Sequence, residues 1–124
     1  MILGLGNDIV EIERIKLIMA RYPGRFLNRI FTPKEQAYCS KRKEPALHFA
    51  GRFAAKEAVV KALGTGFSQG LRWQDFEILP NALGKPDVFL SPAAADLLGR
   101  PSLLVSISHS DHYATAVALW IRNP

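Results

Sequence analysis

Hydrophobic residues recur at helical spacing through the first half of the chain. Isoleucines three residues apart over about 11–21 predict an amphipathic helix that ends at Pro23-Gly24. Thr32-Pro33-Lys34-Glu35 is typical of a helix start with a capping box, and predicts a helix that extends to about Ser40. The longest predicted helix covers about 45–63 and ends at Gly64-Thr65-Gly66, where the backbone needs flexible residues.

The second half of the chain has the pattern of strands separated by turn residues. A brief helix is predicted from Ser91-Pro92 until Gly99 ends it. Together with one strand at the start of the chain, the predicted strands are 1–5, 76–79, 87–90, 103–108 and 113–121. Helices that come early and strands that come late predict an α+β fold. We expect a single domain over residues 1–124, with helices packed on a small, mainly antiparallel sheet.

Composition narrows the class of protein. The chain has 124 residues, of which 48% are hydrophobic and 22% charged, and this balance predicts a globular protein. No apolar run approaches the roughly 18 residues that a membrane span needs, and the N-terminus lacks a basic leader with a cleavage site. The single cysteine, Cys39, favours a reducing compartment. We therefore expect a cytoplasmic protein.

Positive charge is concentrated in the first half of the chain. Residues 1–61 carry 12 lysines and arginines against 6 acidic residues, whereas residues 62–124 carry 4 against 5. Between Glu13 and Glu35 every charged residue is basic: Arg14, Lys16, Arg21, Arg25, Arg29 and Lys34. Such a stretch is either a solvated face or a surface for an acidic partner, which could be a nucleic acid, a phosphate ligand or an acidic protein. Charge alone does not choose among them.

Glu57 departs most clearly from a simple amphipathic pattern. On a helical projection it falls among Phe53 and other apolar residues of the 45–63 helix, and Lys61 lies one turn further along. A carboxylate in that sector is costly unless it is paired or binds a cation. Two interpretations remain open: an ordinary ion pair of Glu57 with Lys61, or a metal ligand beside a lysine that meets a metal-bound anion.

Asp8 provides a second carboxylate. Strand alternation would place Gly4, Gly6 and Asp8 on one side, and the two glycines would allow another backbone or a ligand to come close. An aspartate here is often only a turn or capping residue. If the strand lies beside the long helix, however, Asp8 and Glu57 could share Mg²⁺, which takes few carboxylates and completes its shell with water and substrate phosphates.

Other chemical motifs are weak when taken singly. Lys61 precedes the glycines of the 64–66 turn, so the pattern is not a P-loop. Residues 106–112 contain serine, histidine and aspartate, but their adjacency argues against a hydrolase triad.

Taken together, three blocks of the sequence resemble the holo-acyl-carrier-protein synthase family, the short phosphopantetheinyl transferases. They are Gly4–Glu11, Phe49–Gly66 with its long Phe-Ala-Ala-Lys-Glu-Ala core, and Val105–Ala114. A weaker fourth block is Asn81 to Pro86, and the stretch 87–101 matches poorly. The blocks occur in the family's order and cover nearly the whole chain.

The resemblance implies a reaction and a set of site residues. The phosphopantetheine arm of coenzyme A would be transferred to a serine of apo acyl carrier protein, a step of fatty acid biosynthesis, with release of adenosine 3',5'-bisphosphate. Asp8 and Glu57 would bind Mg²⁺ and Lys61 would stabilise phosphoryl charge, while Glu57 or a metal-bound water would accept the serine proton. The family's phosphopantetheinyl transferase-like fold and homotrimer, with sites at subunit interfaces, are expected as well. The strand 114–121 could form that contact or be an internal core strand.

By the same resemblance, further residues would contact the substrates. Those expected to hold coenzyme A, besides Lys61, are Arg52, Gly64, Gly66, Asn81, Gly84, Lys85, Pro86, Ser108 and His109. Those expected to bind the acidic carrier protein are Arg14, Met19, Arg21, Arg25 and Phe26. A small nucleic-acid-binding module would explain the charge but not Glu57, and a non-catalytic trimeric scaffold would leave Asp8 and Lys61 without a role. We therefore expect no nucleic-acid or membrane partner.

Overall fold

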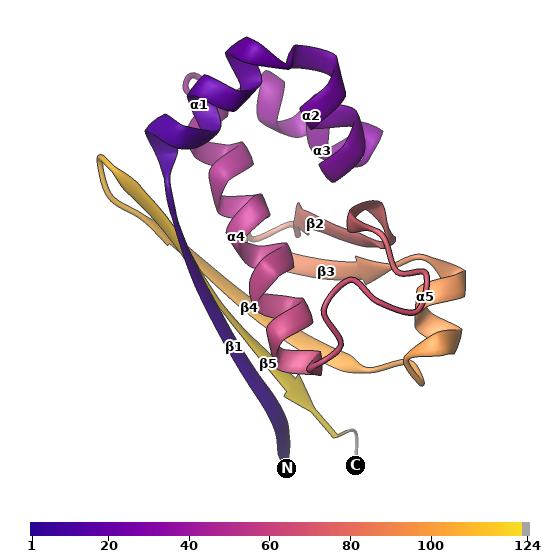
Figure 1. Ribbon diagram of the computed structural model, residues 1–124. Helices are drawn as coiled ribbons and strands as arrows, with labels where there is room; N and C mark the ends of the chain where they lie inside the picture. The colour runs from indigo at the N-terminus through magenta and orange to yellow at the C-terminus, as the bar shows by residue number, and fades with distance from the viewer. Residues whose placement is uncertain (123–124) are drawn as a thin grey trace.

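A long central helix lies against one face of a three-stranded antiparallel sheet in the computed structural model, which describes residues 1–122 (Figure 1). The helix is α4 (Pro45–Leu63), and the sheet has the order β1 (Ile2–Glu11), β5 (Tyr113–Ile121) and β4 (Ser102–His109). Gly64, with φ of +74°, ends α4 in the left-handed conformation that its sequence predicts. The expected α+β class is confirmed.

The other elements surround this unit. Three short helices, α1 (Ile12–Arg21), α2 (Pro23–Ile30) and α3 (Pro33–Ser40), connect β1 to α4. A separate two-stranded antiparallel sheet consists of β2 (Phe76–Pro80), preceded by the 3₁₀ turn η1 (Trp73–Asp75), and β3 (Pro86–Leu90). The helix α5 (Pro92–Leu97), predicted from Ser91-Pro92, then leads to β4, and the side chain of Ser91 caps its N-terminus.

Three details of the sequence-based picture were wrong. The first strand does not end near Leu5 but runs to Glu11, because its whole length pairs with β5. Pro23-Gly24 does not simply end a helix: Pro23 occupies the first turn of α2, a position where its missing N–H costs nothing. The strands form two sheets rather than one, with no pairing between β2–β3 and the larger sheet in the described part of the chain.

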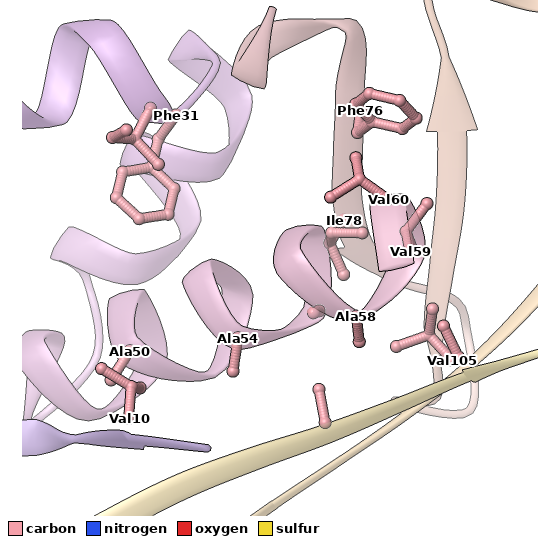
Figure 2. Packing of buried hydrophobic residues seen from close by; sticks show 14 of the residues in the cluster. Val10, Phe31, Ala50, Ala54, Ala58, Val59, Val60, Phe76, Ile78 and Val105 are labelled. Carbon is pink, nitrogen blue, oxygen red and sulfur yellow. The ribbon is translucent and has the colours of Figure 1, made fainter. Parts of the chain in front are cut away.

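Small residues let β1 and β5 approach α4 closely. Alanines of α4 face the sheet, among them Ala54 and Ala58, between Val10 and Val105 (Figure 2). On β5 they meet the buried row Ala114, Ala116 and Ala118. At Gly6 the approach is closer still, because a Cβ there would overlap the carbonyl oxygen of Ala58 and lie 2.7 Å from the amide nitrogen of Ala62. The strand and the helix are therefore held in one register.

A buried ion pair ties the short helices to α4. Lys56 and Glu35 are both fully buried, with 2.7 Å between Nζ and Oε1, and Glu35 also forms the expected capping box with Thr32. The ammonium group of Lys56 donates further hydrogen bonds to the carbonyl oxygens of Ile30 and Trp73, at 2.7 and 3.1 Å. Burial lowers the pKa of Lys56, and the neighbouring carboxylate opposes that shift. Lys56 is thus a structural residue.

Cys39 should be chemically inert in the folded protein. Its side chain is fully buried, and burial raises the pKa of the thiol to about 11. At pH 8 we expect the thiol to react with Ellman's reagent far more slowly in the native protein than in guanidinium chloride, with one equivalent released on unfolding. Immediate stoichiometric reaction of the native protein would contradict this placement.

Within residues 1–122, none of the helices combines the length and the apolar composition that a bilayer crossing requires.

Candidate functional site

Asp8 and Glu57 lie on two neighbouring elements, where β1 runs alongside the C-terminal half of α4. Positions 4, 6, 8 and 10 of β1 alternate toward the helix, so Asp8 lies on the same side of the strand as Gly6. Since Gly6 touches the backbone at Ala58, the neighbour of Glu57, the glycine contact also brings the two carboxylates near each other. The strand and the helix are adjacent, which is the condition under which the two carboxylates could share a site, and the charge of Asp8 acts on Glu57.

Lys61 lies beside the same pair. Its Nζ is 3.2 Å from Oδ1 of Asp8 and donates a hydrogen bond to the carbonyl oxygen of Asn7 at 3.0 Å. Glu57 has no ion pair among the described residues, so the simple pairing with Lys61 is not formed. The lysine remains half exposed, which leaves its ammonium group accessible to a bound anion.

The electrostatics of Glu57 favour a bound cation. Partial burial raises its pKa, the negative charge of Asp8 raises it further, and Lys61 opposes both effects. Two carboxylates that repel each other are stabilised by a divalent ion between them. Within residues 1–122 no third acidic, histidine or cysteine ligand joins them. This donor set fits Mg²⁺, which keeps several waters and binds substrate phosphates, better than it fits zinc.

The surroundings of Glu57 differ from the expected apolar sector. Because the sheet and the other helices enclose α4, most of its residues are buried, including Arg52 and Lys56. Phe53 and Glu57 are half-buried and Lys61 is exposed, so these three form the least covered line along the middle of the helix. Glu57 is therefore at the edge of the core and open to a ligand, rather than inside it.

Arg52 lies deeper than a surface phosphate ligand would. It is 6% exposed, and its Nε and Nη1 donate to the carbonyl oxygens of Ile78 and His48, at 3.1 and 3.4 Å. His109 is exposed at the end of β4, and it is near enough that its charge contributes to lowering the pKa of His48. Arg52, His48 and the end of β4 at Ser108 and His109 thus belong to one region of the molecule.

The other expected coenzyme A residues lie in two turns. Gly64 and Gly66, with φ of +74° and +59°, follow α4 directly. Residues 81–85 form the β2–β3 turn, and Pro86 begins β3. In the turn Asn81 Oδ1 accepts hydrogen bonds from the amides of Leu83 and Lys85, and Gly84 has φ of +83°. No side chain of that turn contacts Asp8 or Glu57 through a hydrogen bond or ion pair in the described residues.

The residues expected to bind a carrier protein share the α1–α2 region. Arg14, Arg21 and Arg25 are exposed, while Met19 and Phe26 are half-buried against the core. Phe26 also lies 6.4 Å from Phe53, measured between ring centroids, and Phe53 is one turn before Glu57 on α4. The basic surface of α1 and α2, with apolar side chains between its charges, therefore lies near Phe53, one turn of α4 from Glu57.

A model of the 4'-phosphopantetheinyl transferase superfamily matches residues 4–118 of the chain. The chain belongs to this superfamily. The match includes Asp8, Glu57, Lys61 and the Ser108-His109 turn, and it confirms the resemblance seen in the sequence blocks.

Relatives within the phosphopantetheinyl transferase superfamily match over nearly their whole length. A holo-[acyl-carrier-protein] synthase of Protochlamydia amoebophila is 65% identical over 120 residues, which are 97% of this chain and 98% of the relative. One from Chlorobium limicola is 53% identical over 120 residues, 97% and 94% of the two chains. These relatives give no support to the alternative of a nucleic-acid-binding module.

Solved structures of superfamily members have the same fold. The crystal structure of the holo-[acyl-carrier-protein] synthase from Neisseria meningitidis superposes with a TM-score of 0.91 at 34% identity, covering 98% of this chain and 100% of that one. The Helicobacter pylori enzyme, solved in complex with coenzyme A, gives 0.85 at 35% identity and covers 94% and 99%.

Proposed function

We propose that the protein is a holo-acyl-carrier-protein synthase. It transfers 4'-phosphopantetheine from coenzyme A to a serine hydroxyl of apo acyl carrier protein and releases adenosine 3',5'-bisphosphate. The observation that carries this proposal is the cluster of Asp8, Glu57 and Lys61, formed by a strand and a helix in a chain that matches synthases over nearly its whole length. The single buried cysteine suits a reducing compartment, and we place the reaction in the cytoplasm, in fatty acid biosynthesis.

Asp8 and Glu57 would hold Mg²⁺, which when bound neutralises charge on the pyrophosphate of coenzyme A. The half-exposed ammonium group of Lys61, fixed by Asp8 Oδ1 and the carbonyl of Asn7, is aimed at the same space and stabilises negative charge on phosphoryl oxygens. The rigid contact of β1 with α4 holds these groups in place before substrate arrives, so little reorganisation accompanies transfer.

Coenzyme A would extend from these carboxylates and contact three groups of residues. The open turn at Gly64 and Gly66 allows the pyrophosphate to approach backbone amides. Arg52 and the Ser108-His109 turn would bind phosphate. The β2–β3 turn, Asn81 to Pro86 with Gly84 and Lys85, would line the adenine side.

An apolar sheet face supports a homotrimer. On the side of the sheet away from α4, Leu5 and Ile9 of β1 are 66% and 61% exposed, and Leu104 and Val117 of the neighbouring strands 46% and 43%. Four large apolar side chains together on one sheet face are unfavourable in water. The alanine side of β5 is internal core, so only its other side is free for a subunit contact. Copies of the chain would cover this face and complete sites at the subunit interfaces.

The decisive experiment supplies both substrates. The protein is mixed with Mg²⁺, coenzyme A and apo acyl carrier protein, and the carrier is weighed by intact mass spectrometry. We expect a phosphopantetheine-sized gain that EDTA prevents and added Mg²⁺ restores. A carrier of unchanged mass would overturn the proposal. A gain in mass that EDTA does not prevent would overturn the proposed dependence on Mg²⁺.

Arg14→Glu should weaken the encounter with the acidic carrier. Arg14 is exposed on α1, so reversing its charge replaces attraction with repulsion and should raise KM for the carrier about tenfold at low salt, with KM for coenzyme A unchanged. Steady-state kinetics at two ionic strengths measure both constants. Arg100→Glu, the same change on an exposed arginine beyond α5, is the matched control. A defect confined to coenzyme A would contradict the assignment of α1 to the carrier.

A further inference from the structure

Two guanidinium groups lie close to the aromatic ring of Tyr38 in α3. The Cζ atoms of Arg42 and Arg52 lie 4.3 and 4.5 Å from the ring centroid. Arg42 Nη2 also donates a hydrogen bond of 2.5 Å to the Tyr38 hydroxyl. Because the face of an aromatic ring carries negative charge density, it can hold two cations that would otherwise repel each other.

Two histidines add to this positive region. The imidazole of His48 meets the Tyr38 ring edge to face, with centroids 6.2 Å apart and planes at 87°. Burial lowers the pKa of His48, and the positive charges of Arg52, Arg42 and His109 lower it further; Glu44 is the acidic neighbour that opposes them. Four basic side chains, from α4, from β4 and from the loop between α3 and α4, are therefore within electrostatic reach of one another.

The guanidinium of Arg52 is buried without a counter-charge. It is 6% exposed and donates to carbonyl oxygens, but neither Arg52 nor Arg42 forms an ion pair with a carboxylate in residues 1–122. A buried charge that lacks an opposite partner costs free energy. An anion with more than one negative charge would relieve that cost for several cations at once.

We propose that Tyr38 is a positioning residue that makes the protein specific for a phosphomonoester, by holding Arg42 and Arg52 ready to bind it. The proposal rests on the proposed function. In coenzyme A the 3'-phosphate is a monoester with two negative charges at neutral pH, whereas each of the two phosphates of the pyrophosphate carries one. The 3'-phosphate is therefore the group that this cation cluster selects, and Tyr38 acts on it only through the arginines.

The test compares two donors, coenzyme A and 3'-dephospho-coenzyme A. We expect the unaltered protein to have the lower KM for coenzyme A. Tyr38→Leu removes the ring and should raise KM for coenzyme A about tenfold, with kcat and the constants for dephospho-coenzyme A and carrier unchanged. Tyr38→Phe keeps the ring and should stay within about threefold of the unaltered protein on either donor. A purely structural role would instead make Tyr38→Leu equally defective with both donors, and that result would overturn the proposal.

A second variant and a binding measurement keep the proposal falsifiable. If Tyr38→Leu does not fold, Arg42→Gln at an exposed position should still lower the preference for coenzyme A about threefold or more. Calorimetry with adenosine 3',5'-bisphosphate and adenosine 5'-monophosphate tests the cluster without catalysis. If the protein transferred nothing but bound the bisphosphate more tightly, the proposed function would fail and the phosphomonoester site would stand. Equal affinities for the two nucleotides would overturn the phosphomonoester site itself. So would an Arg42→Gln variant that keeps the full preference for coenzyme A over dephospho-coenzyme A.

Discussion

Glu57→Gln is expected to reduce phosphopantetheine transfer by a factor of about a thousand or more, because it removes one of two charged ligands and keeps the shape. Among residues 1–122 Glu57 has no ion pair to lose, so the fold should remain intact. The sign of its pKa shift adds a second expectation. A carboxyl whose pKa is raised on folding is less favourable ionised in the native state than in the unfolded chain. Its stability contribution is lost as pH rises through the native pKa, so at pH 7 the glutamine variant should melt at the same or a higher temperature.

The measurements are intact mass spectrometry of the carrier and thermal melts followed by circular dichroism. Glu11→Gln, the same change at an exposed position at the end of β1, should leave transfer unchanged. Full activity of Glu57→Gln at limiting Mg²⁺ would exclude Glu57 as a ligand, and a much lower melting temperature would show that its role is structural.

Gly6→Ala is expected to destabilise the native state by about 3 kcal/mol, at the upper end of the usual range for overpacking. The new methyl group would overlap the carbonyl oxygen of Ala58 and press on the amide of Ala62, and backbone atoms of α4 cannot turn aside as a side chain can. The strand would have to move away from the helix and take Asp8 with it. Transfer activity should therefore fall even where the variant is still folded. Urea denaturation gives the free energy of unfolding, and the mass assay gives the activity.

Gly24→Ala provides the matched control. Gly24 lies in the first turn of α2, and the nearest atom to a Cβ there is Nδ2 of Asn28 at 3.6 Å, an ordinary contact. Since alanine favours helix over glycine, this variant should be as stable as the parent or slightly more so. Equal stability of Gly6→Ala and Gly24→Ala would mean that β1 does not pack on α4 as described.

Most elements could be predicted because their signals are local. The capping box of Thr32 and Glu35 marks α3, and Gly64 marks the end of α4. The start of α2 at Pro23 could not be predicted, because the same proline suits both the end of one helix and the first turn of the next. The full length of β1 was hidden for a different reason: its second half is fixed by pairing with residues more than a hundred positions later.

The candidate site residues also divide into those marked by a local signal and those fixed by contacts between distant parts of the chain. Asp8 and Glu57 were selected from their residue types, and the close approach of their elements was signalled by Gly4 and Gly6. The burial of Lys56 was not predictable, since its partner Glu35 is 21 residues away on another helix. Tyr38 was missed as well. Tyr38 and Arg42 are four residues apart, a spacing that brings side chains together on a helix, although Arg42 lies just beyond α3. No local pattern linked Tyr38 to Arg52.

The pairing of β1 with β5 has a consequence for biosynthesis. Within the described chain β5 is the only sheet neighbour of β1, and the ribosome makes it more than a hundred residues after β1. A nascent chain that has exposed Asp8, Glu57 and Lys61 can begin to form α4, but the strand carrying Asp8 lacks its hydrogen-bonding partner until residues 113–121 emerge. The enzyme should therefore become competent only after residues 113–121 have left the ribosome, and nascent chains stalled before residue 113 should bind neither metal nor coenzyme A.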